Sequence, residues 1–353
     1  MNARIVLLPG DGIGPEVVAA AAAVLDAVAA RFDHRFSLDR HPIGGVALRA
    51  GGRALPAATR AACVEADAVL LGAVGDPEFD GAPRDCRPET ALLELRQTLG
   101  VFANLRPAKV WPGLEGGSSL RPELIDNLDL LIVRELTGGL YYAEPRGRTA
   151  DGDAAFNTMR YTRSEIQRIA RVAFESARLR SGRVTSVDKA NVLEVSRLWR
   201  EVVTEVATEY PDVILEHQLV DSCALLLVSN PRKFDVLLAG NLFGDILSDE
   251  AGAVVGSLGL LPSASIGGRG GLFEPVHGSA PDIAGQDVAN PVAAIASVGM
   301  LLRHALALDA EAQAIEVAIG RTLADGVRTV DIAGGGPSVS CSTMTQAVLE
   351  RLA

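Results

Sequence analysis

With 353 residues, the chain can form two domains or one large α/β unit, and a 48% share of hydrophobic residues lets it bury a large core. Its net charge of −11, from 44 acidic and 33 basic residues, argues against a nucleic-acid-binding surface, which requires a basic face. This charge does not exclude an anionic small-molecule substrate, because a few arginines concentrated in a cleft can outweigh the overall sign.

The cysteines and the apolar stretches indicate a cytoplasmic protein rather than a secreted or membrane-spanning one. The four cysteines are Cys63, Cys86, Cys223 and Cys341. None forms a Cys-x-x-Cys pair, so neither a zinc knuckle nor a redox pair is expected, and reduced thiols in the cytoplasm fit best. The N-terminus leads almost directly into an apolar run at 4–8 and has no signal-peptide pattern. The longest apolar stretch, 291–308, is broken by Arg303 and His304 and predicts a buried or interface helix.

Apolar runs of strand length alternate with helix-like stretches along the chain. Strands are expected at 4–8, 68–74, 102–106, 129–135, 183–188, 213–217 and 234–239. Helices are expected at 15–31, 164–180, 193–209, 245–256, 291–308, 310–325 and 343–352. This alternation predicts an α/β fold with a mostly parallel sheet. Val, Leu, Ile and Ala are expected to fill the core, because only 4% of the residues are aromatic.

A glycine-rich turn at 10–15 follows the first predicted strand and opens the first predicted helix. Gly10, Gly12 and Gly14 suggest a dinucleotide-binding turn, but Pro15 breaks the required Gly-x-Gly-x-x-Gly spacing. No acidic residue closes a second strand about 20 residues later, as the Rossmann fold requires. The turn is therefore either a tight structural connection or a ligand-contacting loop of another kind.

Two aspartates, Asp245 and Asp249, stand four residues apart just after the predicted strand at 234–239. In a helix, both carboxylates lie on one face, with Cβ atoms about 5–6 Å apart. Two like charges at this spacing repel unless a cation lies between them, and a hard divalent ion such as Mg²⁺ or Mn²⁺ is the usual one. The alternative is a solvated acidic turn near a helix start, where the helix dipole favours aspartate.

Three arginines end apolar or structured segments: Arg96, Arg106 and Arg134. A guanidinium group at the end of a buried strand is costly unless it meets an anion. Because guanidinium groups bind carboxylates in bidentate fashion, three of them can hold a dicarboxylate. The alternative is that each arginine pairs with a neighbouring glutamate, such as Glu135 beside Arg134.

Three more polar residues follow predicted strands or turns. Lys189 closes the strand at 183–188, and the carboxyl ends of strands are where ligands gather in α/β sheets. A lysine near other cations and a metal has a lowered pKa and can shuttle protons, whereas a simple pair with Asp188 or a distant glutamate is the alternative. Tyr141 follows a Gly-Gly turn, and Asp221 is a third candidate metal carboxylate.

The segment 273–291 contains many turn-forming residues and ends at a predicted helix start. Within it, His277 can hydrogen-bond to or stack on an adenine, and Asp282 can accept hydrogen bonds from both hydroxyls of an adenosine ribose. A carboxylate at this position repels a 2′-phosphate and so favours NAD over NADP. The alternative is an ordinary surface loop whose polar groups cap one another.

Together these segments resemble the isocitrate/isopropylmalate family of metal-dependent β-decarboxylating dehydrogenases, which also includes homoisocitrate, tartrate and D-malate dehydrogenases. The resemblance covers nearly the whole chain and is carried by LPGDGIGPE at 8–16, FANLRP at 102–107, VRELTGGLY at 133–141, DKANVL at 188–193, GNLFGDILSDE at 240–250 and the loop at 273–291. It implies an isopropylmalate dehydrogenase-like fold of two domains with a parallel or mixed sheet, not a classical Rossmann fold.

The resemblance also implies how the two domains divide the work. Residues 1–101 plus 254–353 would form domain one, with most of the NAD contacts. Residues 102–253 would form domain two, with the substrate and metal sites and the dimer interface. The protein would be a homodimer with shared active sites.

For the active site, the resemblance implies that Asp245 and Asp249, with Asp221 of the partner subunit, coordinate one Mg²⁺ or Mn²⁺. The substrate carboxylates would be held by Arg96, Arg106 and Arg134. Lys189 of the partner subunit would assist removal of the hydroxyl proton, and Tyr141 would protonate the enolate carbon after CO₂ leaves. The NAD-binding residues would be Glu274, His277, Gly278, Ser279, Ala280, Asp282 and Asn290.

Substrate choice in this family depends on the segment 87–93. Leu92 and Leu93 offer an apolar surface for an isopropyl group, and Glu89 repels a further carboxylate such as that of isocitrate. An apolar pocket rejects a charged group strongly, but it discriminates against one missing methylene by only about 1–3 kcal/mol. The predicted reaction is therefore the NAD-dependent oxidative decarboxylation of 3-isopropylmalate in leucine biosynthesis. A tartrate or D-malate dehydrogenase of the same family is one alternative, and a catalytically silent binding subunit is another.

Overall fold

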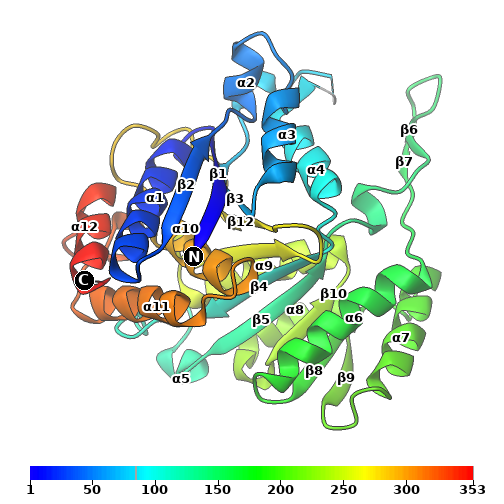
Figure 1. Cartoon of the computed structure of the whole chain (residues 1–353). Helices are drawn as coiled ribbons and strands as arrows, with labels where there is room; N and C mark the ends of the chain where they lie inside the picture. The colour runs from blue at the N-terminus through cyan, green and yellow to red at the C-terminus, as the bar shows by residue number, and fades with distance from the viewer. Residues whose placement is uncertain (84–85, 353) are drawn as a thin grey trace. The chain divides into compact units, whose positions relative to one another are not determined.

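The computed structural model describes residues 1–83 and 86–352. The chain divides into two compact units, whose elements are labelled in Figure 1. Unit 1 comprises Met1–Val101, Val110–Ser119 and Gly256–Ala353, and unit 2 comprises Phe102–Lys109 and Leu120–Val255. The segment Val110–Ser119 thus belongs to unit 1, although the division expected from the sequence had placed all of 102–253 in the second domain.

The strands of unit 1 follow the spatial order β2-β1-β3-β12-β11. Their bounds are β1 Asn2–Gly10, β2 Arg35–Arg40, β3 Ala68–Ala73, β11 Pro262–Ile266 and β12 Leu272–Pro275. Neighbouring strands run parallel except β11 and β12, which are antiparallel. Every residue of β3 is buried, as expected for an apolar run covered on both faces.

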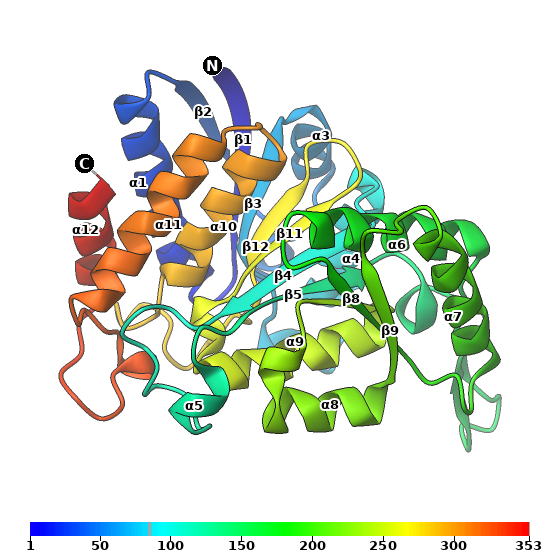
Figure 2. The same cartoon turned by 90° about the horizontal axis from the view of Figure 1, so that it is seen from below.

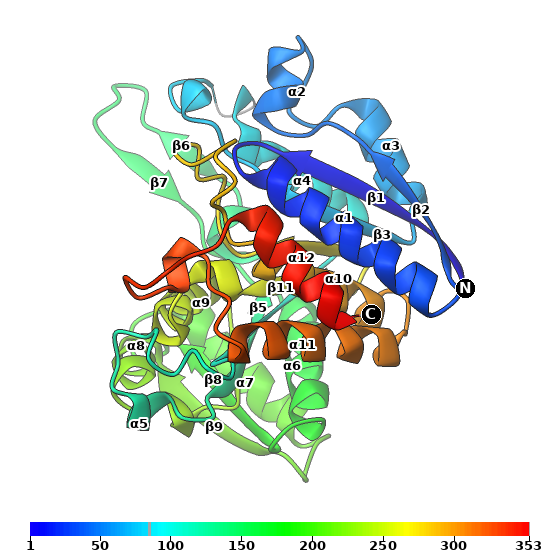
Figure 3. The ribbon, with the colours of Figure 1, turned by 90° about the vertical axis from the view of Figure 1, so that its left-hand side faces the viewer.

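The helices of unit 1 are α1 Gly14–Arg31, α2 Gly45–Arg49, α3 Ala57–Glu65, α4 Pro88–Leu99, α10 Val292–His304, α11 Asp309–Ala324 and α12 Cys341–Leu352. Helices α1 and α10 pack on the sheet, and α11 and α12 pack on these two helices (Figure 3). The apolar stretch predicted at 291–308 forms α10, whose residues from Val292 to Leu302 are all buried, so the prediction of a buried helix is confirmed.

In unit 2, the strands follow the order β4-β5-β10-β8-β9. Their bounds are β4 Ala103–Lys109, β5 Asp129–Glu135, β8 Arg183–Asp188, β9 Ile214–Leu219 and β10 Val236–Ala239. The β4–β5 pair is antiparallel, and the other neighbouring pairs are parallel. A separate hairpin consists of β6 Arg146–Arg148 and β7 Ala155–Asn157.

Two pairs of helices cover the sheet of unit 2 on opposite faces (Figure 2). These helices are α6 Arg163–Arg178 and α7 Glu194–Ala207 on one face and α8 Val220–Ser229 and α9 Asn241–Val255 on the other; α5 is Pro122–Ile125. At the start of α6, the backbone N–H of Thr162 donates to Glu165 at 2.7 Å, and that of Glu165 donates to the Thr162 hydroxyl at 3.3 Å, which forms a reciprocal cap.

The prediction of an α/β chain with mostly parallel strands is confirmed, and each expected strand and helix has a counterpart. The sequence reasoning missed the strands β2, β6, β7, β11 and β12 and the helices α2, α3, α4, α5 and α8. Among the described residues, every helix is too short or too polar to span a membrane. The four cysteines form no disulfide.

Candidate active site

A cluster of arginines and aspartates lies where β4, β5 and α9 meet in unit 2. Arg134, the second-last residue of β5, pairs with Ala239 at the end of β10, so the chain that leaves β10 starts α9 next to this arginine. Gly244 permits the close approach, because a Cβ there would lie 2.8 Å from the side chain of Arg134. The guanidinium of Arg134 is ion-paired with Asp245 of α9.

The second arginine of this cluster, Arg106 of β4, reaches both aspartates of α9. Its Nη1 lies 3.3 Å from Asp245 Oδ1 and 3.7 Å from Asp249 Oδ1. The same nitrogen donates to the Ser248 hydroxyl at 2.6 Å, and Nε donates to Asn104 Oδ1 at 2.7 Å. The predicted helical spacing of the two aspartates is therefore present, and in this single chain a guanidinium group supplies the positive charge near both.

The donor set suits a hard divalent cation. The side chains of Asp245 and Asp249 are 32% and 60% exposed, so their carboxylate oxygens remain accessible although arginines contact them. Carboxylate oxygen is the ligand type that Mg²⁺ and Mn²⁺ prefer. Within the described part of this one chain, the carboxylates of Asp221, Asp245 and Asp249 do not gather within reach of a single ion.

Tyr141 completes the cluster from a short helical turn at Gly139–Tyr141, after β5. Its hydroxyl donates to Asp245 Oδ2 at 2.9 Å, and its ring lies 5.7 Å from the guanidinium carbon of Arg134. Burial, followed by the negative charge of Asp245, raises the pKa of Tyr141. The phenol is therefore protonated at neutral pH, and its raised pKa makes it a weaker proton donor than a free tyrosine.

Burial also raises the pKa of Asp249, and the charge of Asp245 adds to this increase, whereas Arg106 opposes it. Loss of hydration is thus the main cost of charging Asp249, and the nearby Arg106 guanidinium outweighs the repulsion from Asp245. A further cation beside this partly buried carboxylate would favour its ionised form, which is the form that binds a metal.

Lys189 and Asp221 form an ion pair of their own in unit 2. Lys189 follows β8 directly, and Asp221 lies in the first turn of α8. Their Nζ and Oδ1 atoms are 2.8 Å apart, and the hydrogen bond from Lys189 lowers the pKa of Asp221. The alternative partner considered for the lysine, Asp188, binds Arg200 instead at 2.9 Å.

Helix α4 of unit 1 carries the residues expected to select the substrate. Arg96 Nη2 lies 2.8 Å from Glu274 Oε1 of β12, and both side chains are buried. Glu89, Leu92 and Arg96 are spaced by three and four residues, so they share one face of the helix. Leu95 points into the core, while Leu92 and Leu93 are only half-buried.

The segment 273–291 starts in β12 and lies against the glycine-rich turn of the N-terminal strand. Ile13 N donates to Ser279 O at 2.8 Å, and a Cβ at Gly12 would lie 1.9 Å from the same oxygen. Gly12 has φ +56°, a conformation that glycine adopts without strain. The turn therefore packs against the predicted cofactor loop, a contact that fits both interpretations of the turn.

His277 lies in this loop with one ring nitrogen unsatisfied. Its Nδ1 is 2.9 Å from Gly278 O, whereas Nε2 is buried and has no hydrogen-bond partner among the described residues. Burial lowers the pKa of His277, which keeps the ring neutral at pH 7. A neutral ring with an open nitrogen fits the edge of an adenine, and this orphaned atom is the observation that matches an NAD site.

The other residues predicted to bind NAD have distinct environments. Asp282 is exposed, and Ala280 has φ +37°. Asn290 is buried, accepts from Val292 N at 3.0 Å through Oδ1, and donates to Asp331 at 3.0 Å through Nδ2. Asn290 therefore fastens the end of the loop to the start of α10.

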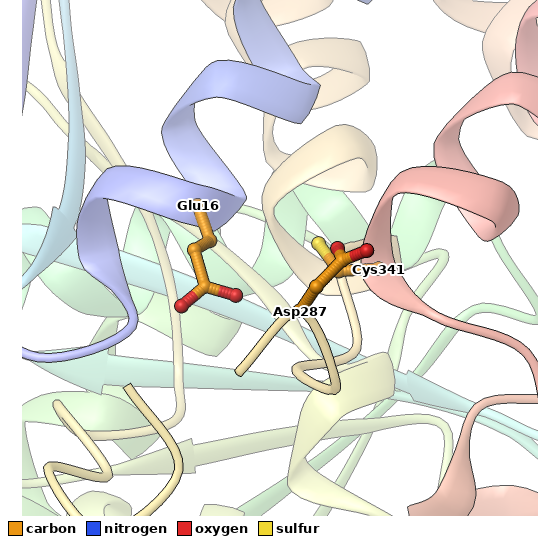
Figure 4. Close-up of side chains that lie close together, drawn as sticks. All are labelled: Glu16, Asp287 and Cys341. Carbon is orange, nitrogen blue, oxygen red and sulfur yellow. The ribbon is translucent and has the colours of Figure 1, made fainter. Parts of the chain in front are cut away.

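Figure 4 shows a third group of close side chains, Glu16, Asp287 and Cys341, whose ligand-type atoms lie within 4.8 Å of one another. Gly285 N donates to Glu16, and Ser342 donates to Asp287 through its backbone N–H at 2.8 Å and its hydroxyl at 2.6 Å. These bonds attach the far part of the predicted cofactor loop to α1 and α12.

Sequence reasoning missed two buried polar residues that organise these regions. In unit 1, Asp11 accepts backbone N–H bonds from Gly45, Val46 and Gly75, at 2.9, 2.9 and 3.0 Å. In unit 2, Asn241 binds Arg134 and the turn that leads to Tyr141. All of these partners are 34 or more residues away in the sequence, so no local pattern could identify the two residues.

The chain is similar to known proteins in both sequence and fold. A model of the family described as isocitrate/isopropylmalate dehydrogenase matches residues 4–348. A 3-isopropylmalate dehydrogenase from Prochlorococcus marinus is 56% identical over 353 residues, which covers 99% of each chain. One from Nitratidesulfovibrio vulgaris is 57% identical over 357 residues and 100% of each chain. The crystal structure of isocitrate dehydrogenase from Methylococcus capsulatus has a TM-score of 0.89, 37% identity and 99% coverage of each chain.

Proposed function

The chain belongs to the isocitrate/isopropylmalate dehydrogenase family, and from this premise we propose that it catalyses the NAD-dependent oxidative decarboxylation of (2R,3S)-3-isopropylmalate to 4-methyl-2-oxopentanoate and CO₂, a step of leucine biosynthesis. The observation that carries the proposal is the cluster in which Arg106 and Arg134 face Asp245 and Tyr141. It combines cations for a dicarboxylate, oxygen ligands for a metal and a protonated acid.

The two buried arginines of unit 2 are proposed to hold the malate carboxylates, together with Arg96. The side chains of Arg106 and Arg134 are only 9% and 2% exposed, and each is already fixed by an asparagine on Nε. A guanidinium group that is held on one edge binds a carboxylate on its other edge with little loss of side-chain entropy. Binding and orienting the diacid is thus the first task of this cluster.

Asp245 and Asp249, with Asp221 of the partner subunit, are proposed to hold one Mg²⁺ or Mn²⁺. When bound, the cation supplies Lewis-acid stabilisation of negative charge on the substrate oxygens. The exposed position of Asp221 at the start of α8, away from the other two aspartates in this single chain, is consistent with a role in a second subunit's site.

Proton transfers are assigned to two side chains. Lys189 of the partner subunit assists removal of the proton from the substrate 2-hydroxyl as hydride leaves C2 for NAD⁺. Tyr141 then donates its hydroxyl proton to the carbon from which CO₂ has departed. The position of the Tyr141 hydroxyl, which donates to Asp245 Oδ2 at 2.9 Å within the cluster, supports this second role, because the donor must lie beside the carbon that it protonates.

The exposed apolar surface of α8 and α9 supports a homodimer. Leu225 and Val228 of α8 are 68% and 43% exposed, and Ile246 of α9 is 56% exposed. These two helices pack together, and Leu225 and Val228 are three residues apart on one face. Exposed apolar patches of this kind mark association surfaces, and a second copy of this chain is the proposed occupant.

A cytoplasmic location is proposed in addition, and the reduced cysteines support it.

The half-buried pair Leu92 and Leu93 supports 3-isopropylmalate over other diacids of the family. We expect kcat/KM for 3-isopropylmalate to exceed that for D-malate, tartrate and isocitrate by at least about tenfold, because the smaller substrates leave the apolar surface unfilled and isocitrate brings an additional charge. Initial rates of NAD⁺ reduction with Mn²⁺ measure this. A higher value for D-malate or tartrate would favour the sister activity, and inertness toward all four would favour a silent subunit.

NAD is proposed to bind at the loop through Glu274, His277, Gly278, Ser279, Ala280, Asp282 and Asn290. NAD, when bound, accepts the hydride. The buried and unsatisfied Nε2 of His277 supports an adenine contact, and exposed Asp282 supports a ribose contact.

Replacing Asp282 by lysine should shift cofactor preference. The change removes a carboxylate that repels a 2′-phosphate and adds a cation that attracts it, so kcat/KM for NADP⁺ relative to NAD⁺ should rise at least about tenfold. Asp26→Lys, on the exposed face of α1 in the same unit, makes the same change in charge and should leave the ratio unaltered. If the ratio of kcat/KM for NADP⁺ to that for NAD⁺ is the same in both variants, Asp282 does not contact the ribose.

A further inference from the structure

At the start of α9, one buried asparagine connects two residues of the proposed active site. Asn241 is 1% exposed and follows Gly240, which ends the connection from β10. Its backbone N–H donates to the Tyr161 hydroxyl at 2.7 Å. Its side-chain amide accepts hydrogen bonds through the oxygen and donates hydrogen bonds through the nitrogen, and all the partners are protein groups.

The amide oxygen holds Arg134. Arg134 donates to Asn241 Oδ1 from Nε at 3.0 Å and from Nη2 at 2.7 Å. Because arginine has only donors, the oxygen of the amide must face it. The remaining nitrogen, Nη1, is directed to Asp245. Asn241 therefore fixes one edge of the guanidinium group and leaves the other toward the aspartate cluster.

The amide nitrogen holds the turn that carries Tyr141. Asn241 Nδ2 donates to Leu136 O at 3.0 Å and to Gly138 O at 3.2 Å. The turn has little freedom to move elsewhere, since a Cβ at Gly138 would lie 2.6 Å from the Tyr161 ring. Two residues after Gly139, the Tyr141 hydroxyl reaches Asp245 at 2.9 Å.

From these contacts we infer that Asn241 is a positioning residue: one amide binds the Arg134 guanidinium and the backbone of the turn that carries Tyr141, and so orients both side chains toward Asp245. The inference rests on the proposed function, because it treats Arg134 as the residue that binds the substrate and Tyr141 as the acid. Asn241 itself touches neither the substrate nor the reacting atoms.

The test compares Asn241→Ala with a matched variant at the other end of β10. Asp235 precedes β10 and is 6% exposed; it accepts from Arg180 at 2.7 Å and from the Ser181 hydroxyl at 2.6 Å. Asp235→Ala therefore also removes a buried partner of an arginine. Both variants should lower the melting temperature. Only Asn241→Ala should raise KM for 3-isopropylmalate, by at least about tenfold, because the charged Arg134 guanidinium loses the two hydrogen bonds that hold it.

Two further measurements separate positioning from general damage. KM for NAD⁺ should stay within about twofold of wild type in Asn241→Ala, and kcat should also fall because the Tyr141 turn is released. When Arg134→Lys is already present, adding Asn241→Ala should raise KM for the diacid by a further factor of less than about two. The reason is that substitutions of two interacting residues have non-additive effects. Additive effects, or an unchanged KM in the single variant, would overturn the inference.

Asn241→Ser provides a second variant in case the alanine variant does not fold, since serine is favourable at a helix start but is too short to replace the amide. It should show the same rise in KM, and a wild-type KM would overturn the inference.

The assay of the wild-type protein distinguishes failure of the positioning inference from failure of the proposed function. If wild type prefers another 2-hydroxy diacid, the substrate assignment fails, and Asn241 is judged by KM for that diacid.

Discussion

Asp245→Asn is expected to lower turnover of 3-isopropylmalate by at least about a hundredfold and to weaken the dependence on Mn²⁺ in parallel. Asp245 is the point where Arg106, Arg134 and Tyr141 converge. Asparagine keeps the shape but loses the charge that both arginines contact, and it replaces one oxygen by an NH₂ group. Initial rates across a Mn²⁺ titration, after EDTA treatment, give the turnover and the half-saturating metal concentration together.

Glu250→Gln is the control for Asp245→Asn. Glu250 lies on the same helix, and the change removes one negative charge without touching the arginine pair. Its rate and Mn²⁺ requirement should remain within about twofold of wild type. If Asp245→Asn behaves like this control, the metal assignment of Asp245 is wrong.

Mixing two inactive variants should restore activity if the active sites are shared. Lys189→Ala and Tyr141→Phe should each be nearly inactive as homodimers. In a heterodimer, one site combines the intact Tyr141 of the first chain with the intact Lys189 of the second. Random exchange makes about half of the dimers mixed, with one intact site each, so about a quarter of wild-type activity should return. Activity measured after denaturation and joint refolding of equal amounts checks this.

The control mixture pairs Tyr141→Phe with Arg134→Ala. These residues lie in the same chain's cluster, with the guanidinium carbon 5.7 Å from the ring, so every site of the heterodimer keeps one defect. No activity should return. Recovery in this control would show that Arg134 and Tyr141 do not act in the same chain's site. Absence of recovery in the Lys189 and Tyr141 mixture would show that Lys189 does not serve a neighbouring chain's site.

The fold class and the residues of the cluster could be predicted because their signals are local. Alternating apolar runs predicted β5 and β10, and the four-residue spacing of Asp245 and Asp249 required only a helix to bring them to one face. The sequence also predicted that Arg134 would meet an anion. It left open whether this anion is a bound dicarboxylate or a neighbouring glutamate such as Glu135. In the structure Arg134 pairs with Asp245, which was not among these alternatives, while Glu135 lies 3.5 Å from Arg168.

The remaining features depend on contacts between residues far apart in the chain. β2 alternates charged and apolar residues at a sheet edge, and β11 and β12 are short, so none produced a clear apolar run. Helix α4 was missed although it carries Leu92, Leu93 and Arg96. The pair of Arg96 with Glu274 spans 178 residues, and no spacing rule reaches that far.

Asn241 illustrates the same limit most clearly. In the sequence it was one residue of a recognised motif, and its type gave no reason to rank it above its neighbours. Asn241 matters because its amide accepts from Arg134 and donates to Leu136 and Gly138. These contacts exist only because the pairing of β5 with β10 brings the start of α9 next to the end of β5.

The most direct test of the proposed reaction is to measure NADH formation and CO₂ release together from purified protein, 3-isopropylmalate, NAD⁺ and Mn²⁺. The proposed chemistry predicts equal amounts of the two products and the loss of both when EDTA removes the cation. NADH without CO₂, or a reaction that EDTA does not affect, would contradict the claim that arginines holding a diacid and aspartates holding a metal form one decarboxylating site.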